Sequence, residues 1–109
     1  MEIKETKKNE HVILEIIGRL DTTNYGTLEK KLMELIEGRN LKIIINCRSL
    51  DYISSSGLRV LLLALKMIKR ENGKFILCSL RENIREIFEI SGFTSIFPIF
   101  ASEEEALKA

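Results

Sequence analysis

Hydrophobic residues follow two alternating spacings along this chain, and the alternation predicts its secondary structure. Short runs rich in β-branched residues, bounded by turn residues, predict strands at residues 11–17, 41–47 and 74–79. A weaker alternation predicts a short edge strand at 2–7. Pro98, which cannot donate a backbone hydrogen bond, places a last strand at 96–100 on a sheet edge.

Spacings of three and four residues between hydrophobic positions predict helices in the intervening segments. The predicted helices cover residues 21–38, 55–70, 81–90 and 101–108. We expect the first to be capped by Asp21, Thr22 or Thr23 and to end near Gly38, because glycine often adopts the left-handed conformation that ends a helix.

The helix at 55–70 contains the most apolar stretch of the chain, and the other elements are expected to pack around it. Its predicted buried stripe consists of Leu58, Leu61, Leu62, Leu65 and Ile68. Its predicted solvent side carries Arg59, Lys66 and Arg70. Val60, Leu63 and Met67 remain on an adjoining stripe. Either the helix is buried over a wide arc, or Leu63 and Met67 form a partly exposed patch beside Arg59 and Lys66.

The regular alternation of strand and helix predicts an α/β fold. Strand–helix–strand connections of this length favour parallel neighbours and right-handed crossovers. We therefore expect one domain over residues 1–109, with a mostly parallel or mixed sheet of four to five strands and about four helices packed on it.

Composition narrows the function classes. Hydrophobic residues make up 45% of the chain and charged residues 30%, and the formal net charge of +1 comes without a basic patch for nucleic acid. The longest apolar run, residues 60–65, is too short to span a membrane, and residues 1–5 lack a signal-peptide core. We expect a cytoplasmic protein in which Cys47 and Cys78 are buried free thiols, although sequence alone leaves a disulfide open.

Residues for conventional catalysis are scarce. His11 is the single histidine, far in sequence from the serines discussed below. The chain has no Gly-x-Ser-x-Gly elbow, no glycine-rich phosphate-binding motif and no spacing typical of metal ligands. The acidic run at 103–105 is most simply a solvated face that complements a helix dipole. We therefore predict no catalytic residue, no cofactor and no metal site.

Three consecutive serines, Ser54 to Ser56, lie at the start of the helix at 55–70. The simplest interpretation is that they cap the helix, for which one serine is enough. The functional interpretation is that one hydroxyl is exposed and accepts a phosphate from a kinase. A phosphoserine carries about −1.5 to −2 charges, and a helix N-terminus attracts anions. Phosphorylation here would change the surface potential without unfolding the domain.

The segment from Asp51 to Leu62 resembles the motif of the STAS family, the bacterial anti-sigma-factor antagonists. Shorter matches extend the resemblance over nearly the whole chain: Gly18-Arg19-Leu20-Asp21, Ile43-Ile44-Ile45-Asn46 and Ser91-Gly92-Phe93. The resemblance implies a single STAS-like domain that acts as a partner-switching module. In this family the unphosphorylated antagonist binds an anti-sigma factor that is also a serine protein kinase. Phosphorylation releases it, and a PP2C-type phosphatase resets it.

The resemblance also implies which residues do this. The family motif, Asp-Ser-Ser/Ala-Gly, places the phosphorylated serine two residues before the glycine, which is Ser55 here. Ser54 stands where the family motif has Asp, which removes one negative charge beside the acceptor. Asp21 matches an acidic residue of the family near the same surface. Together with the helix pattern, this predicts a partner-binding set of Asp21, Ser54, Ser56, Arg59, Leu63 and Met67.

Two other functions stay open from sequence alone. One is a STAS-type scaffold subunit of a larger signalling or transport assembly that is never phosphorylated. The other is a small nucleotide-binding or hydrolytic protein, which the missing motifs and the single histidine disfavour.

Overall fold

Strands and helices alternate along the chain as the hydrophobic pattern predicts. The computed structural model describes residues 1–109. The strands are β1 (Glu2–Lys8), β2 (His11–Leu20), β3 (Lys42–Asn46), β4 (Leu50–Ile53), β5 (Lys74–Cys78) and β6 (Ile99–Phe100). The helices are α1 (Tyr25–Glu37), α2 (Ser55–Arg70), α3 (Glu82–Ile90) and α4 (Glu103–Leu107), with a short 3₁₀ turn η1 (Phe93–Ser95). The predicted α/β class is confirmed, whereas the sheet has six strands instead of four to five.

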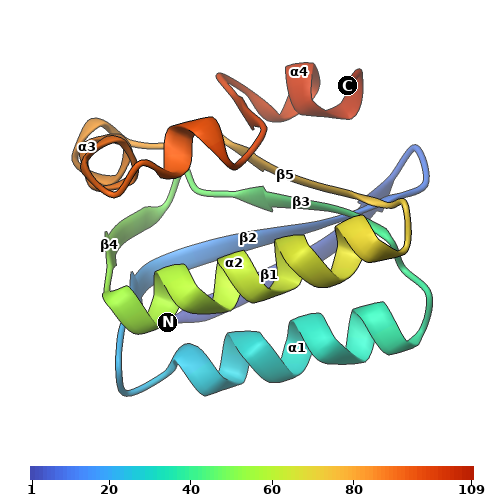
Figure 1. Ribbon diagram of the computed structural model, residues 1–109, viewed down its shortest axis with the longest axis horizontal. Helices are drawn as coiled ribbons and strands as arrows, with labels where there is room; N and C mark the ends of the chain where they lie inside the picture. The colour runs from blue at the N-terminus through green and yellow to red at the C-terminus, as the bar shows by residue number, and fades with distance from the viewer.

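The sheet is mixed, with one antiparallel edge strand. Five strands follow the order β1-β2-β3-β5-β6, and β4 pairs with the end of β2 outside that row. β1 runs antiparallel to β2, and the remaining pairs are parallel. Parallel neighbours need a crossover. The crossover between β2 and β3 contains α1, and the one between β3 and β5 contains β4 and α2 (Figure 1).

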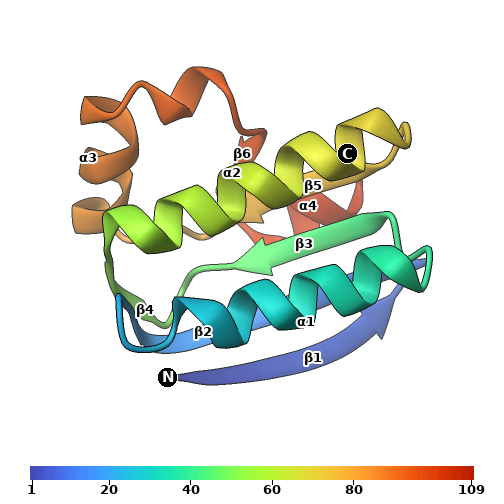
Figure 2. The ribbon, with the colours of Figure 1, turned by 60° about the horizontal axis from the view of Figure 1, so that its bottom comes forward.

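The central strands have two buried faces because their side chains alternate. Val12, Leu14 and Ile45 belong to the main core together with the buried sides of α1, α2 and α3. Ile13 and Ile44, on the other face, pack in a smaller cluster beneath α4. Figure 2 shows α1 and α2 side by side on the near face of the sheet, with α4 on the far face. Each fully buried Leu or Ile contributes about 1.5–3 kcal/mol, so the main core supplies most of the stability.

Strand β2 continues past Gly18, where the sequence predicted its end. Its first part pairs with β3 and its last residues pair with β4, and the register shifts between Gly18 and Arg19. Gly18 has a φ of +97°, a conformation that favours glycine and allows this irregularity. β4 escaped prediction because only its first and last residues are buried, so it lacks strand alternation.

The start of α1 differs from the prediction. Asn24, and none of the three predicted residues, occupies the N-cap position, and its side chain does not cap the helix. Instead Asn24 Nδ2 donates to the Arg19 carbonyl at 2.9 Å, and Asn24 Oδ1 accepts from the Asp21 N–H at 2.9 Å. The Asn24 side chain therefore fixes the loop between β2 and α1.

The end of α1 also differs in detail. Gly38 has a φ of −78° and its N–H still bonds to the Glu34 carbonyl at 3.0 Å, so it continues the helical turn. The left-handed residue is the next one, Arg39, with a φ of +64°. The helix thus ends near the predicted position, but through Arg39 instead of glycine.

Both cysteines of the chain are buried, whereas the isoleucine at the end of α3 is exposed. Cys47 and Cys78 are buried free thiols, as expected, and burial raises the pKa of each. They face opposite sides of the sheet, Cys47 toward the main core and Cys78 toward α4. Ile90, by contrast, is 88% exposed, because it is the last residue of α3 and lies beyond the core.

Candidate functional site

The first turn of α2 assigns different roles to the three serines. Ser54 is the N-cap, and its Oγ accepts from the Gly57 N–H at 3.2 Å. Its own N–H donates to the Leu20 carbonyl at 2.9 Å, and the residue is buried. Ser54 therefore fixes the helix start to the end of β2. Although Ser54 was placed in the partner-binding set, its hydroxyl faces the helix and not the surface.

Ser55 is the exposed serine. It is the first residue of α2, and its hydroxyl has no hydrogen-bond partner within the protein. The first helical N–H groups have no acceptor within a helix, and here only that of Gly57 is taken by a side chain. No acidic residue occupies the first turn. The free N–H groups of this turn therefore favour a negative group on the exposed Ser55.

Gly57 is required by close packing, not by its backbone angles. A Cβ at this position would lie 2.8 Å from Leu20 Cγ and 3.0 Å from Ile53 Cγ1. The first turn of α2 therefore rests directly on the last residues of β2 and β4. This contact positions Ser55 at the end of the sheet.

Asp21 lies next to this turn because it follows Leu20 at the end of β2. Its Oδ1 accepts from the Thr23 hydroxyl at 2.6 Å and from the Thr23 N–H at 3.0 Å, and Arg19 Nε lies 3.5 Å from Oδ2. These contacts, led by the Thr23 hydroxyl, lower the pKa of Asp21. The carboxylate is therefore a fixed negative charge beside the serine turn.

A shallow hollow of about 90 Å³ between α1 and α2 gathers several of the predicted residues. Ser56, Arg59 and Leu63 line it from α2, and Tyr25 and Glu29 line it from α1. Leu63 is 38% exposed, and Arg59 forms no ion pair. The hollow begins one residue after Ser55 and extends along the helix.

The buried side of α2 is wider than the predicted stripe. Leu58, Leu61, Leu65 and Ile68 are buried as expected, whereas Leu62 is only half-buried. Val60, assigned to the adjoining stripe, is buried in the core. Met67 is half-buried and lines a different hollow, with Arg39 and Glu71. The structure thus brings Leu63 near Ser56 and Arg59, but not Met67.

Three further residues lie around the serine turn and were not predicted as part of the site. Tyr25 and Tyr52, the two tyrosines of the chain, are each 38% exposed. The Arg19 guanidinium carbon lies 4.2 Å from the centre of the Tyr52 ring. Exposed Tyr and Arg side chains are enriched at protein interfaces. Tyr52 belongs to the motif segment, so its position beside the serines was the available signal.

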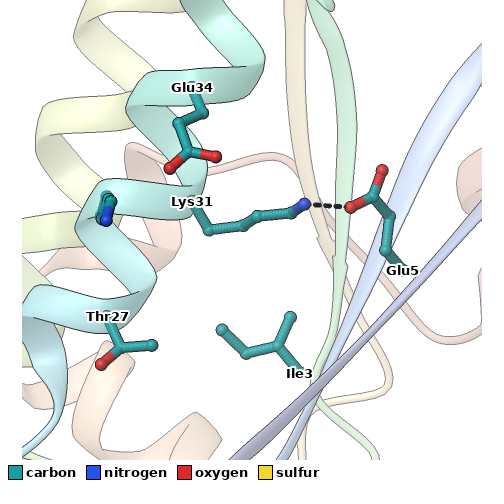
Figure 3. A pocket seen from close by; sticks show the side chains of 6 residues that line it. Ile3, Glu5, Thr27, Lys31 and Glu34 are labelled. Carbon is teal, nitrogen blue, oxygen red and sulfur yellow. Dashed lines mark ion pairs between the residues drawn. The ribbon is translucent and has the colours of Figure 1, made fainter.

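The largest hollow, about 340 Å³, lies elsewhere, between β1 and α1. Figure 3 shows Lys31 and Glu5 paired across it, with Glu34, Thr27 and Ile3 around them. The hollow is lined by two lysines and two glutamates, so its formal charges sum to zero, and only Lys31 and Glu5 form an ion pair. No group of three metal-ligating side chains comes together in the structure, and no helix has the length and apolarity needed to cross a membrane.

The single histidine lies far from the serine turn. His11 begins β2, while Leu20 ends that strand beside Ser54. At about 3.3 Å per strand residue, roughly 30 Å separate the two ends. A serine–histidine pair is thereby excluded at this site.

The sequence matches known proteins over most of its length. The family model described as the STAS domain matches residues 2–106. A Bordetella bronchiseptica protein that carries the name anti-sigma factor antagonist BtrV is 41% identical over 92 residues, which cover 84% of this chain and 79% of that protein. The anti-sigma-B factor antagonist of Bacillus subtilis is 33% identical over 102 residues, 92% of each chain.

Two solved structures have the same fold as this chain. A crystal structure of an anti-sigma factor antagonist from Thermotoga maritima superposes with a TM-score of 0.92 at 24% identity, over 97% of this chain and 92% of that one. The phosphorylated form of the Bacillus cell-fate determinant SpoIIAA superposes with a TM-score of 0.78 at 25% identity, over 98% and 97% of the two chains.

Proposed function

The chain belongs to the STAS domain family and functions as a partner-switching anti-sigma factor antagonist; we propose that Ser55 carries the phosphate that switches it. In this proposal the unphosphorylated chain binds an anti-sigma factor that is also a serine protein kinase, and phosphorylation of Ser55 releases it. A PP2C-type phosphatase then restores the binding form. The chain acts by binding and not by catalysis, without a cofactor or metal.

The exposed, unbonded hydroxyl of Ser55 is the observation that carries this proposal. Ser54 already caps the helix, so Ser55 is free to react without loss of structure. The helix N-terminus favours the added charge within this protein. A bound partner that places its own acidic groups there would be repelled, and like charges at an interface cost several kcal/mol.

The partner-binding surface is proposed to lie around this serine. Asp21 contributes from the β2–α1 loop, and Ser56, Arg59 and Leu63 contribute from α2. Met67, about one turn beyond Leu63, lines a separate hollow and is proposed to extend the surface along the helix. Ser54 takes part indirectly, because its bonds to Gly57 and Leu20 fix the turn that presents Ser55.

The test is phosphopeptide mapping after incubation with the cognate kinase and ATP. We expect the label on Ser55, its loss in Ser55→Ala, and normal labelling in the matched Ser56→Ala variant. The aspartate variant Ser55→Asp should stay folded, yet bind the kinase at least tenfold more weakly. Undiminished label in Ser55→Ala would assign the phosphate to another residue. Kinase binding without any phosphorylation would instead favour a STAS scaffold subunit.

A further inference from the structure

Arg59 is the one charged residue in the first two turns of α2, the helix that begins at Ser55. It follows Ser55 by four residues, and side chains at this spacing lie on the same face of a helix, with their Cβ atoms about 5–6 Å apart. Both residues are exposed, and the guanidinium of Arg59 forms no ion pair within the protein. An unpaired cation therefore lies one turn beyond the hydroxyl that is proposed to carry the phosphate.

Two other arginines near the serine turn are already paired with carboxylates. Arg19 Nε lies 3.5 Å from Asp21 Oδ2. Arg81 donates to Asp51 Oδ1 at 2.7 Å. A phosphate on Ser55 could recruit either arginine only by weakening one of these contacts, whereas the guanidinium of Arg59 has no such contact to lose.

Carboxylates on the neighbouring elements increase the need of a phosphate for a cation. Glu29 of α1 lines the same hollow as Arg59, and the starts of α1 and α2 lie at the same end of the molecule (Figure 2). Asp21, whose pKa is lowered mainly by the Thr23 hydroxyl, adds a second negative charge beside the turn. A phosphate with about −1.5 to −2 charges would be repelled by both carboxylates, and Arg59 is placed to offset that repulsion.

We propose that Arg59 binds the phosphate of Ser55 within the same chain, as a charge-assisted pair across one turn of α2. This inference rests on the proposed phosphorylation of Ser55 and gives a regulatory role to a residue of the proposed partner-binding surface. The planar guanidinium can donate two N–H bonds to two phosphate oxygens, a geometry that a lysine cannot reproduce. Phosphorylation then changes the docking surface twice, because it adds negative charge at Ser55 and withdraws the positive charge of Arg59 from the partner.

The experiment uses the full chain with phosphoserine inserted in place of Ser55 during translation, so that no kinase is needed. A pH titration followed by ³¹P NMR gives the second pKa of the phosphate, which is about 6 in free phosphoserine. We expect this pKa to be higher when Arg59→Gln is added, with an acid dissociation constant smaller by about twofold or more. Arg59→Lys, which keeps the charge but not the planar fork, should give an intermediate value.

The arginine side-chain signals of the ¹⁵N-labelled chain distinguish a direct bond from a distant charge effect. The Arg59 Nε–H signal should shift as the phosphate loses its second proton, with the same midpoint as the ³¹P titration. Over that pH range it should stay in place in the unphosphorylated chain. The Arg19 Nε–H signal should remain nearly unchanged in both forms.

Lys66→Gln is the matched control, because Lys66 is an exposed cation of α2 about three turns, or about 16 Å, from Ser55. That distance exceeds the screening length of about 8 Å at physiological salt, so the phosphate pKa should not change. An unchanged phosphate pKa in Arg59→Gln would overturn the proposal, as would a titrating signal from Arg19 instead of Arg59. Both results would leave the assignment of the phosphate to Ser55 intact, which phosphopeptide mapping tests separately.

Discussion

Ser54 and Ser55 are adjacent serines, but they have different structural roles at the start of α2. Ser54 is buried and bonds to Gly57, while Ser55 is exposed and bonds to nothing within the chain. Loss of a serine N-cap costs about 1 kcal/mol. We therefore expect Ser54→Ala to lower the free energy of unfolding by about this amount and Ser55→Ala to leave it nearly unchanged, as measured by urea denaturation.

The variant Ser54→Asp also tests whether residue 54 caps α2, because it replaces one capping side chain with another. Aspartate is as good a cap as serine, and the family motif has Asp at this position, so stability should be retained. Equal losses in Ser54→Ala and Ser55→Ala would contradict the division of roles.

Gly57 offers a second test at the residue scale. Alanine favours helices over glycine by about 1 kcal/mol, but a methyl group here would overlap Leu20 and Ile53. Overpacking costs about 1–3 kcal/mol, so we expect Gly57→Ala to lower the melting temperature. Gly26→Ala in α1, where nothing lies within 4 Å of the new Cβ, should raise it. A stabilised Gly57→Ala variant would show that the turn is loosely packed.

Glu15 makes stability depend on pH. Its carboxylate accepts from Arg48 Nε at 3.0 Å and from the Ser49 hydroxyl at 2.9 Å, and the Arg48 bond in particular lowers its pKa in the folded protein. A pKa below the unfolded value of about 4.3 stabilises the fold above that pH, and the stabilisation is lost as pH falls through the folded pKa. We expect wild type to exceed Glu15→Gln in stability at pH 7 and the difference to shrink as pH falls below the unfolded value of about 4.3. A difference that does not shrink with acidification would contradict this.

At the scale of elements, local signals predicted α2 well. Its stripe of leucines lies within the sixteen residues of the helix and its serine cap directly precedes them, so its bounds follow from the sequence. β4 was missed because its structure depends on pairing with β2, a partner about thirty residues away. The width of the buried arc stayed open between two alternatives, since the burial of Val60 depends on where α1 lies.

In the candidate site too, some features follow from local sequence and others only from long-range packing. Ser55 could be identified from the motif, whereas the roles of Tyr25 and Tyr52 could not, because their exposure results from long-range packing. Likewise, Leu63 and Met67 are four residues apart on one helix, and this spacing did not show that they would line different hollows.

Leu63 provides the test of α2 as a docking element. Because it is 38% exposed, Leu63→Glu should leave the circular-dichroism spectrum and melting curve nearly unchanged. Affinity for the kinase should fall at least tenfold, about 1.4 kcal/mol. Leu61→Glu is the matched control, since Leu61 is fully buried and its replacement should unfold the domain. A folded Leu63→Glu variant with normal affinity would place the partner elsewhere.

At the scale of the whole molecule, β2 organises the fold. It is the longest strand, and it pairs with β1 on one side and with β3 and then β4 on the other. Its end at Leu20 brings the Asp21 loop and the start of α2 together, although they are more than thirty residues apart. One end of the molecule thus carries the proposed switch.

The two edge strands of the sheet, β1 and β6, lead to a prediction about whether the chain associates with itself. β6 is only two residues long and follows Pro98, and five of the seven residues of β1 are charged. Short or charged edge strands resist the addition of another strand. We expect the purified chain to sediment as a monomer, and to remain one in the variant Ser55→Asp. A dimer that dissociates when β1 charges are reversed would contradict this.

The charged edge strand β1 also bears on whether a partner-switching regulator aggregates. A protein that is repeatedly captured and released spends part of its time with its docking surface uncovered. An uncharged border strand would then offer a template for stacking copies into fibrils, which would remove the regulator from circulation. The alternating Glu and Lys side chains of β1 act as gatekeepers against such aggregation. We therefore expect released copies to stay monomeric and able to bind a partner again.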